Sequence, residues 1–284
     1  MTSPKTTTTT TSSPPFKVLI FSKTAGYRHA SIPAGISALQ RLALSSLSSS
    51  NPFTAEATED PSVFDSASSL SSTYRVIILL QCSGDFLSPS QLSSLQSFIE
   101  IPSSPKKGIV AIHCASCGHP SSEWYTNKAI GASFSDHPEP QKGIVRVVDL
   151  THPILVGSLG KGDKGVWTNR KAETKEEEQE EWEWEWLDEW YNFKTHPLQV
   201  KDQRIHVLLT VDEASYKGGN HGDDHPIAWC REFDGPGNRS FYTALGHFDE
   251  AYKDEGFMSQ LLGGILWTAG VYDEVSGDGD ETSV

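Results

Sequence analysis

Long apolar runs are missing from this chain of 284 residues. No stretch reaches the roughly 18 consecutive apolar residues that a membrane-spanning helix needs, so we expect no membrane partner. Hydrophobic residues still make up 37% of the chain and aromatic residues 10%. That share supplies enough apolar side chain for a core, and the composition therefore predicts a soluble globular protein.

Cysteine is scarce, and a secretory leader is not recognisable. Four thiols are too few for a disulfide framework in a chain of this length. The first residues, MTSPKTTTTTTSSPP, lack the apolar core of roughly 7 to 15 residues that a secretory signal requires. We therefore expect a reducing, cytoplasmic location. The four thiols belong to Cys82, Cys114, Cys117 and Cys230.

Basic residues are outnumbered. The chain has 23 Lys and Arg against 37 Asp and Glu, which gives a formal net charge of −14. Nucleic acids and anionic membranes bind clustered Lys and Arg, so this balance argues against both partners. Ten acidic residues and one basic residue fall between Glu173 and Glu189. Most of the net charge is therefore concentrated in one segment.

Three segments are expected to lie outside the core. Residues 1–15 form a Thr/Ser/Pro tract that cannot bury apolar area, and we predict disorder there and in residues 273–284. Residues 160–187 form an acidic, Trp-rich insertion. Its alternation of Glu and Trp suits a strand, but such charge is more typical of a solvated loop, which is our prediction. One domain over residues 16–272 remains.

Strand, polar turn and helix alternate along the first part of the chain. Near-continuous apolar runs at Phe16–Phe21, 74–80 and 107–113 are typical of buried parallel strands, and residues 53–58 fit a shorter one. Ser88, followed by Pro and by Gln three positions on, predicts the start of a helix. The pattern predicts an α/β fold with a doubly wound, mostly parallel, flavodoxin-like sheet and helices on both faces.

Later apolar segments extend this sheet. We predict a closing helix over residues 257–268, and further strands over residues 143–148, 205–211, 226–231 and 240–246. Ligands of such sheets bind at the carboxyl ends of the strands. The polar turns that follow Phe21, Leu80 and Ile112 should therefore meet in one place.

Five ordered motifs resemble the ThuA-like (trehalose utilisation) family. They cover the chain from residue 16 to about residue 270, which makes the combination specific although each motif alone is weak. The resemblance implies a fold similar to that of class I glutamine amidotransferases and a role in disaccharide or keto-sugar metabolism. The motifs are KVLIFSKTAGYRHASI (17–32), GIVAIH (108–113), DEWYNF (188–193), GDDHPIAW (222–229) and YTALGH (242–247).

In a glutamine amidotransferase, a Cys nucleophile occupies the tight turn after an apolar strand. Here that position is His113, and Cys114 comes one residue late. A slip of one residue redirects the side chain, so neither Cys114 nor Cys117 is predicted to be a nucleophile. The pair is formally a C-x-x-C motif, which leaves a redox role or half of a zinc site completed by His113 and His119 as alternatives. Buried, unreactive thiols are the simpler expectation.

Histidines and one glutamate in the family motifs are the main candidates for chemistry. We predict Glu189, His113 and His247 as catalytic acid/base residues, because imidazole and carboxylate groups exchange protons near neutral pH. Several imidazoles beside a carboxylate also describe a divalent-metal site. The candidate ligands are His113, His225, His247 and Glu189, and no cofactor is certain.

Substrate binding is predicted for a second set of side chains. A cation and hydroxyl in the first turn could contact sugar oxygens, and aromatic rings offer flat apolar faces to a sugar. His-Pro dipeptides at His137, His152 and His196 are interpreted as turns. The predicted substrate-binding residues are Lys23, Thr24, His29, Trp124, Tyr191 and His225.

The predicted function is action on a disaccharide such as trehalose, or on its keto-derivative, by acid/base chemistry with or without a metal ion. An isomerase, lyase, hydrolase or dehydrogenase partner would fit, whereas glutaminase activity is not expected. The partner is a small sugar, and a homo-oligomer is compatible with the sequence. The alternative is a non-catalytic sugar-binding or assembly protein with an amidotransferase-like fold.

Overall fold

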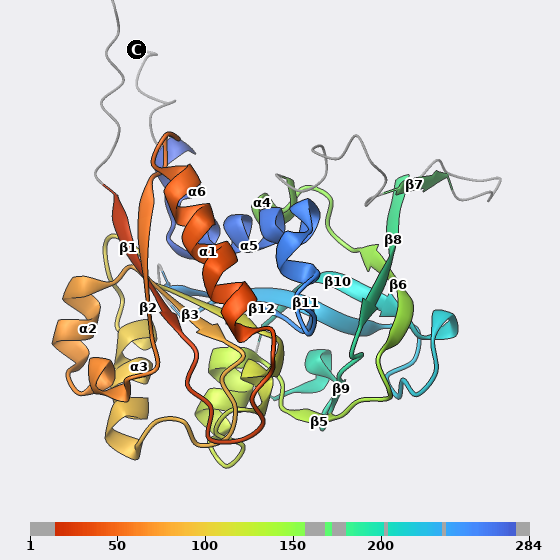
Figure 1. The fold of residues 1–284 in the computed structure, drawn as a ribbon, viewed down its shortest axis with the longest axis horizontal. Helices are drawn as coiled ribbons and strands as arrows, with labels where there is room; N and C mark the ends of the chain where they lie inside the picture. Colours follow the sequence, from red (N-terminus) through yellow and green to blue (C-terminus); the bar gives the residue numbers. More distant parts are fainter. Residues whose placement is uncertain (1–14, 157–167, 172–179, 202–203, 235–236, 277–284) are drawn as a thin grey trace, which may run out of the picture.

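The structure, a computed structural model, describes residues 15–156, 168–171, 180–201, 204–234 and 237–276. Within these residues one ten-stranded mixed sheet runs through the molecule (Figure 1). Its five neighbouring parallel strands are, in spatial order, β2 (Phe53–Thr58), β1 (Phe16–Phe21), β3 (Val76–Leu80), β4 (Gly108–Ile112) and β12 (Arg239–Thr243).

Beyond β12 the sheet continues with antiparallel pairing. Each strand of this half pairs with its neighbour in the opposite direction, so the sheet has a parallel core and an antiparallel extension. The strands are, in spatial order, β11 (His225–Glu232), β10 (His206–Asp212), β6 (Gln141–Val147), β8 (Glu180–Asp188) and β7 (Thr168–Lys171). A separate two-stranded sheet joins β5 (Phe134–Asp136) to β9 (Asn192–Phe193).

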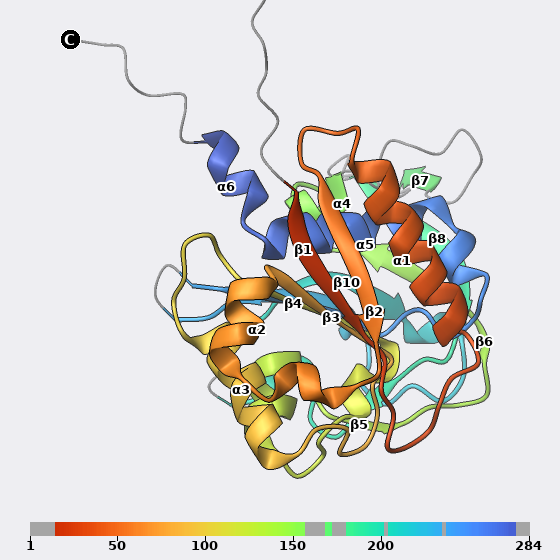
Figure 2. The same ribbon diagram turned by 60° about the vertical axis from the view of Figure 1, so that its left-hand side comes forward.

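Helices cover both faces, as predicted. One face carries α1 (Ile32–Ser46), α4 (Pro153–Val156), α5 (Glu255–Thr268) and α6 (Val271–Ser276). The opposite face carries α2 (Ala67–Thr73) and α3 (Pro89–Glu100), which pack against each other (Figures 1 and 2). The doubly wound α/β class is therefore confirmed.

Burial explains why the parallel strands were recognisable. Every residue of β3 and β4 is buried between the two helical layers, so both strands consist of apolar side chains and one glycine. That glycine, Gly108, lets α5 approach closely, because a Cβ there would lie 2.5 Å from the Thr268 side chain. The start of α3 is a capping box between Ser88 and Gln91, as its sequence predicts.

Two predictions about the edges of the domain are wrong in part. The acidic insertion is not all loop, since β8 pairs with β6 from Gln141↔Asp188 to Arg146↔Glu183. Charge does not exclude a strand here, because the pairing supplies a base: Arg146 on β6 contacts the buried Glu183 of β8, with Nε 2.7 Å from Oε1. The C-terminal segment predicted as disordered begins in α6, which extends to Ser276. Residues 1–14, 157–167, 172–179 and 277–284 lie outside the described part of the chain.

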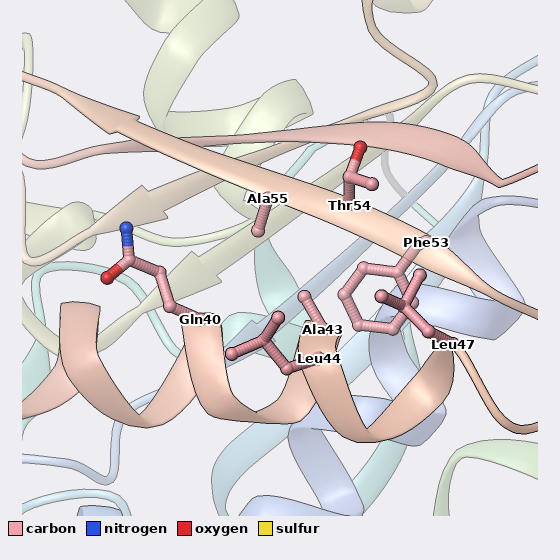
Figure 3. Close-up of a pocket in the computed structure, with 7 residues that line it drawn as sticks. All are labelled: Gln40, Ala43, Leu44, Leu47, Phe53, Thr54 and Ala55. Atoms are coloured by element: carbon pink, nitrogen blue, oxygen red, sulfur yellow. The ribbon is translucent and has the colours of Figure 1, made fainter.

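A shallow groove of about 300 Å³ lies between α1 and β2 (Figure 3). Its lining is apolar apart from Gln40 and Thr54, and Leu44 is 67% exposed beside it. The groove involves the first residues of β2, and therefore lies away from the carboxyl ends of the parallel strands. Among the described residues, no helix is both long and apolar enough to cross a membrane.

Candidate functional site

The polar turns at the carboxyl ends of the parallel strands meet, as the α/β pattern predicts. Thr24, after β1, bridges to Ser83, after β3, and Gly84 bridges to Gly118, after β4. The amides of Ala25 and Gly26 donate to the Ser83 carbonyl oxygen at 2.8 and 3.1 Å. Three turns are thereby fixed side by side at one edge of the sheet.

His113 occupies the elbow directly after β4. Its φ is +53°, in the left-handed region that non-glycine residues seldom adopt, and the chain continues as a 3-10 helix, His113–Cys117. The side chain is fully buried. The strained position directly after β4 therefore presents an imidazole to the carboxyl edge of the sheet.

Four side chains converge at this elbow: His29, His113, Glu189 and His247, here called the His–Glu cluster. One ligand atom from each lies within 4.8 Å of the others. Glu189 Oε2 is 3.1 Å from His247 Nδ1, 3.4 Å from His113 Nε2 and 3.8 Å from His29 Nε2. His29 Nε2 and His113 Nε2 are 3.2 Å apart. The cluster is a group that could bind a metal ion.

Hydrogen bonds hold the Nδ1 atoms of His113 and His29, which point away from the cluster. His113 Nδ1 is 2.6 Å from the Ala244 carbonyl oxygen, and because that oxygen can only accept, Nδ1 carries the hydrogen. His113 Nε2 then faces the cluster, where it lies 2.9 Å from the Tyr191 hydroxyl. His29 Nδ1 faces Cys114 Sγ at 3.2 Å. Both rings thus aim Nε2 inward.

The electrostatics of the cluster keep Glu189 ionised. Burial alone would raise the pKa of Glu189, but the imidazoles of His113, His247 and His29 close to its carboxylate outweigh that effect and hold this pKa far below its usual range. Burial lowers the pKa of His29. Burial also disfavours the charged form of His247, yet its contact with Glu189 raises the pKa of His247 overall. The carboxylate is the charge around which the imidazoles are arranged.

Asp188, at the end of β8, holds the cluster's backbone. Its side chain is fully buried. Oδ1 accepts from the amides of Glu189 at 2.9 Å and His247 at 3.3 Å, and Oδ2 accepts from the Gly246 amide and Trp186 Nε1, both at 2.9 Å. One carboxylate therefore joins the ends of β8 and β12, which carry Glu189 and His247.

A pocket of about 600 Å³ opens onto the cluster. Glu189 and His29 reach it from the cluster, and aromatic rings form part of its wall. His137 was interpreted from sequence only as a turn residue, but its Nε2 lies 3.6 Å from Glu189 Oε1. Nothing in a His-Pro dipeptide signals such a contact, which depends on the fold of the β5 segment. The lining is Gly26, Tyr27, His29, Ser83, Gly84, Cys114, Cys117, Phe134, His137, Glu189 and Tyr191.

Four predicted site residues lie elsewhere. Lys23 and Thr24 are in the first turn but do not line the pocket. Trp124 donates from Nε1 to Glu100 Oε1 at 2.8 Å. His225 is fully buried with both ring nitrogens occupied. His29, rather than His225, completes the group of potential metal ligands.

Cys114 and Cys117 are close to the cluster but poorly suited to nucleophilic attack. The buried Cys114 thiol donates to the Gln81 carbonyl oxygen at 3.1 Å. Burial raises the pKa of Cys114 well above its usual value and that of Cys117 to about 12. Since the thiolate is the reactive form, neither thiol is activated.

Comparisons with known proteins agree with the motifs. A scan of protein families matches ThuA, described as trehalose utilisation, over residues 17–161 and 165–268. A comparison with curated proteins gave no match. Among solved structures, a ThuA-like protein from Bacteroides uniformis is similar in fold, with a TM-score of 0.63 and 20% identity over 90% of this chain and 91% of that one. Because the family match spans most of the sequence, the chain belongs to the ThuA (trehalose utilisation) family.

Proposed function

We propose that this protein is an enzyme of disaccharide metabolism that acts on trehalose, a similar disaccharide or its keto-derivative, assisted by a divalent metal ion. The observation that carries the proposal is the convergence of three imidazoles and one carboxylate next to a pocket that His29 and Glu189 line. A pocket of about 600 Å³ lies within the range of small-ligand sites, which are roughly 300 to 1,000 Å³.

The spacing of the ligand atoms supports a metal. Bonds of about 2.1 Å to a tetrahedral ion place neighbouring ligand atoms about 3.4 Å apart. Four of the separations within the His–Glu cluster lie between 3.1 and 3.8 Å. Metal-bound imidazoles usually donate their other N–H to an acceptor, as His113 does to the Ala244 carbonyl oxygen.

His247 supplies an independent test of this fit. Its Nδ1 is buried and makes no hydrogen bond of good geometry, although Glu189 Oε2 is only 3.1 Å away. An unpartnered buried nitrogen is costly in a native protein, and a cation would satisfy it. His29, His113, His247 and Glu189 would hold the ion, which when bound supplies a Lewis acid for a sugar oxygen or a bound water.

The protein's own groups would bind and orient the sugar. Tyr27, Phe134 and Tyr191 line the pocket and offer ring faces to the C–H surfaces of a sugar. Burial raises the pKa of Tyr191 well above its usual value, so its hydroxyl remains a hydrogen-bond donor. Glu189 stays a carboxylate and is therefore suited to hold a cation or accept a proton, rather than to donate one.

The decisive experiment compares metal-free and reloaded protein on trehalose and a keto-trehalose. Proton NMR in D₂O would detect a new product and hydrogen exchange at carbon next to the carbonyl. We expect turnover only after an ion such as Zn²⁺ or Mn²⁺ is added, and loss of turnover in Glu189→Gln. Glu185→Gln, at an exposed position of β8 just before Glu189, is the matched control.

Two outcomes would contradict the proposal. Unchanged turnover in Glu189→Gln would exclude the cluster as the reaction centre. Saturable sugar binding with no chemical change under any metal would instead favour the non-catalytic sugar-binding alternative.

A further inference from the structure

A second carboxylate–imidazole pair, Glu213 and His225, lies outside the His–Glu cluster. His225 begins β11 and is fully buried. Its Nδ1 is 2.7 Å from Glu213 Oε1 and 2.9 Å from the Tyr216 hydroxyl, and its Nε2 is 2.9 Å from the Tyr191 carbonyl oxygen. With both nitrogens engaged, His225 could bind an ion or a sugar only by losing one of these contacts.

The hydrogen on His225 Nε2 follows from its partner. A carbonyl oxygen can only accept, so Nε2 carries a hydrogen whether the ring is neutral or charged. Glu213 Oε1 also accepts from the His221 amide at 2.7 Å, which holds the carboxylate in place. The pair is therefore directed at the backbone of Tyr191.

Tyr191 connects this pair to the cluster. Its ring stacks on His113, with centroids 4.4 Å apart and planes at 29°, and its hydroxyl lies 2.9 Å from His113 Nε2. The segment that carries Glu189 and Tyr191 is held at its start by Asp188 and at its end by His225. Both holding side chains are fully buried.

We propose that Glu213 and His225 are positioning residues that set the Tyr191 hydroxyl against His113 and the pocket. The catalytic consequence rests on the function proposed above, whereas the structural coupling of His225 to His113 does not. His225 acts through Tyr191, rather than as a ligand or a substrate contact.

The coupling can be measured without substrate by ¹⁵N NMR of the His113 ring in metal-free protein. Tyr191→Phe removes the hydroxyl, so it should shift the Nε2 signal of His113. His225→Asn loses the donor to the Tyr191 carbonyl and should shift that signal in the same direction. His225→Gln, whose terminal amide can reach the carbonyl, should shift it by less than half as much.

His206→Asn, at an exposed imidazole on the neighbouring strand β10, is the matched control and should leave the His113 signal unchanged. Urea unfolding confirms that each variant is folded. On a substrate that the wild type turns over, His225→Asn should lower kcat roughly 10- to 100-fold with KM within about twofold, as loss of a supporting residue does.

A folded His225→Asn variant with the wild-type His113 signal would overturn the proposal. If that variant does not fold, Glu213→Gln decides: a His113 shift in the same direction but smaller supports the coupling, and no shift overturns it. If no protein shows turnover, the proposed function fails while the NMR result still decides the coupling.

Discussion

Two carboxylates in this protein meet imidazoles in opposite ways. Glu189 faces three histidines whose inward nitrogens share a common centre, and His247 Nδ1 there has no hydrogen-bond partner. Glu213 faces His225, whose two nitrogens are both engaged. The first arrangement leaves a ring nitrogen that could still bind a metal ion or a ligand. In the second, both ring nitrogens already contact groups of the protein. A carboxylate beside an imidazole therefore does not by itself indicate a ligand site. A buried polar atom without a hydrogen-bond partner does.

The largest difference between the two carboxylates is expected in metal affinity, when the charge of Glu189 is removed. We expect Glu189→Gln to lower the affinity for Zn²⁺ at least about 100-fold, because the only carboxylate among the four ligands is lost. Competition with a chromophoric chelator measures the affinity. Glu213→Gln should bind the ion within about threefold of wild type, and equal losses in both variants would erase the distinction.

Metal removal should destabilise the wild type considerably more than it destabilises Glu189→Gln. An ion present at a thousand times its Kd stabilises the folded state by about 4 kcal/mol, or roughly 10 °C in Tm for a chain of this size. Thermal unfolding with and without EDTA measures the shift. A wild-type Tm that does not respond to EDTA would show that the cluster holds no ion.

In metal-free protein, acid should reduce the stability that the ionised carboxylates of Glu189 and Glu213 contribute. The pKa of Glu189 and that of Glu213 are lowered in the folded state, so each contributes stability above its ordinary value of 4.5 that is lost as pH falls below it. In urea unfolding, the stability advantage of wild type over Glu189→Gln should shrink between pH 6 and pH 3. An advantage that grows on acidification would contradict the ionised carboxylate.

Loss of the Glu213 carboxylate should cost stability with little effect on metal content. We expect Glu213→Gln to lower the free energy of unfolding by about 1 to 3 kcal/mol, since the half-buried carboxylate that accepts from the His221 amide and contacts His225 Nδ1 is altered. Urea unfolding at pH 7 measures the loss, and elemental analysis the metal. A variant as stable as wild type would show that the contact between Glu213 and His225 does not stabilise the fold.

The smallest effect is expected at Cys117. Its pKa of about 12 leaves almost no thiolate at neutral pH, so Cys117→Ser should change turnover less than twofold. A glutamine-analogue alkylating agent should not label the wild type, as mass spectrometry would detect. Stoichiometric labelling would instead support amidotransferase chemistry.

The parallel half of the fold was predictable, and the antiparallel half less so. Strands β3 and β4 are buried on both faces, so their sequences are apolar throughout. Strand β8 is rich in Glu, and its buried Glu183 forms an ion pair with Arg146 on another strand. Local sequence cannot reveal a partner that lies 37 residues away.

The same limit explains what was found and missed at the site. His29, His113, His247 and Glu189 were visible because each belongs to a family motif at a strand end. The separate location of His225 was not visible, because it depends on contacts with Glu213, Tyr216 and the Tyr191 carbonyl oxygen. His137 meets Glu189 through the course of the β5 segment, which a His-Pro dipeptide does not specify.

The hydrogen bonds of Asp188 that join the segments after β8 and β12 also bear on the order of folding. His29 and His113 follow β1 and β4, whereas Glu189 and His247 follow β8 and β12 much later in the chain, where Asp188 joins the two segments. Long-range pairings of this kind form late. We therefore expect the four side chains of the His–Glu cluster to come together only once β8 and β12 are in place. Metal capture would then mark the completion of folding.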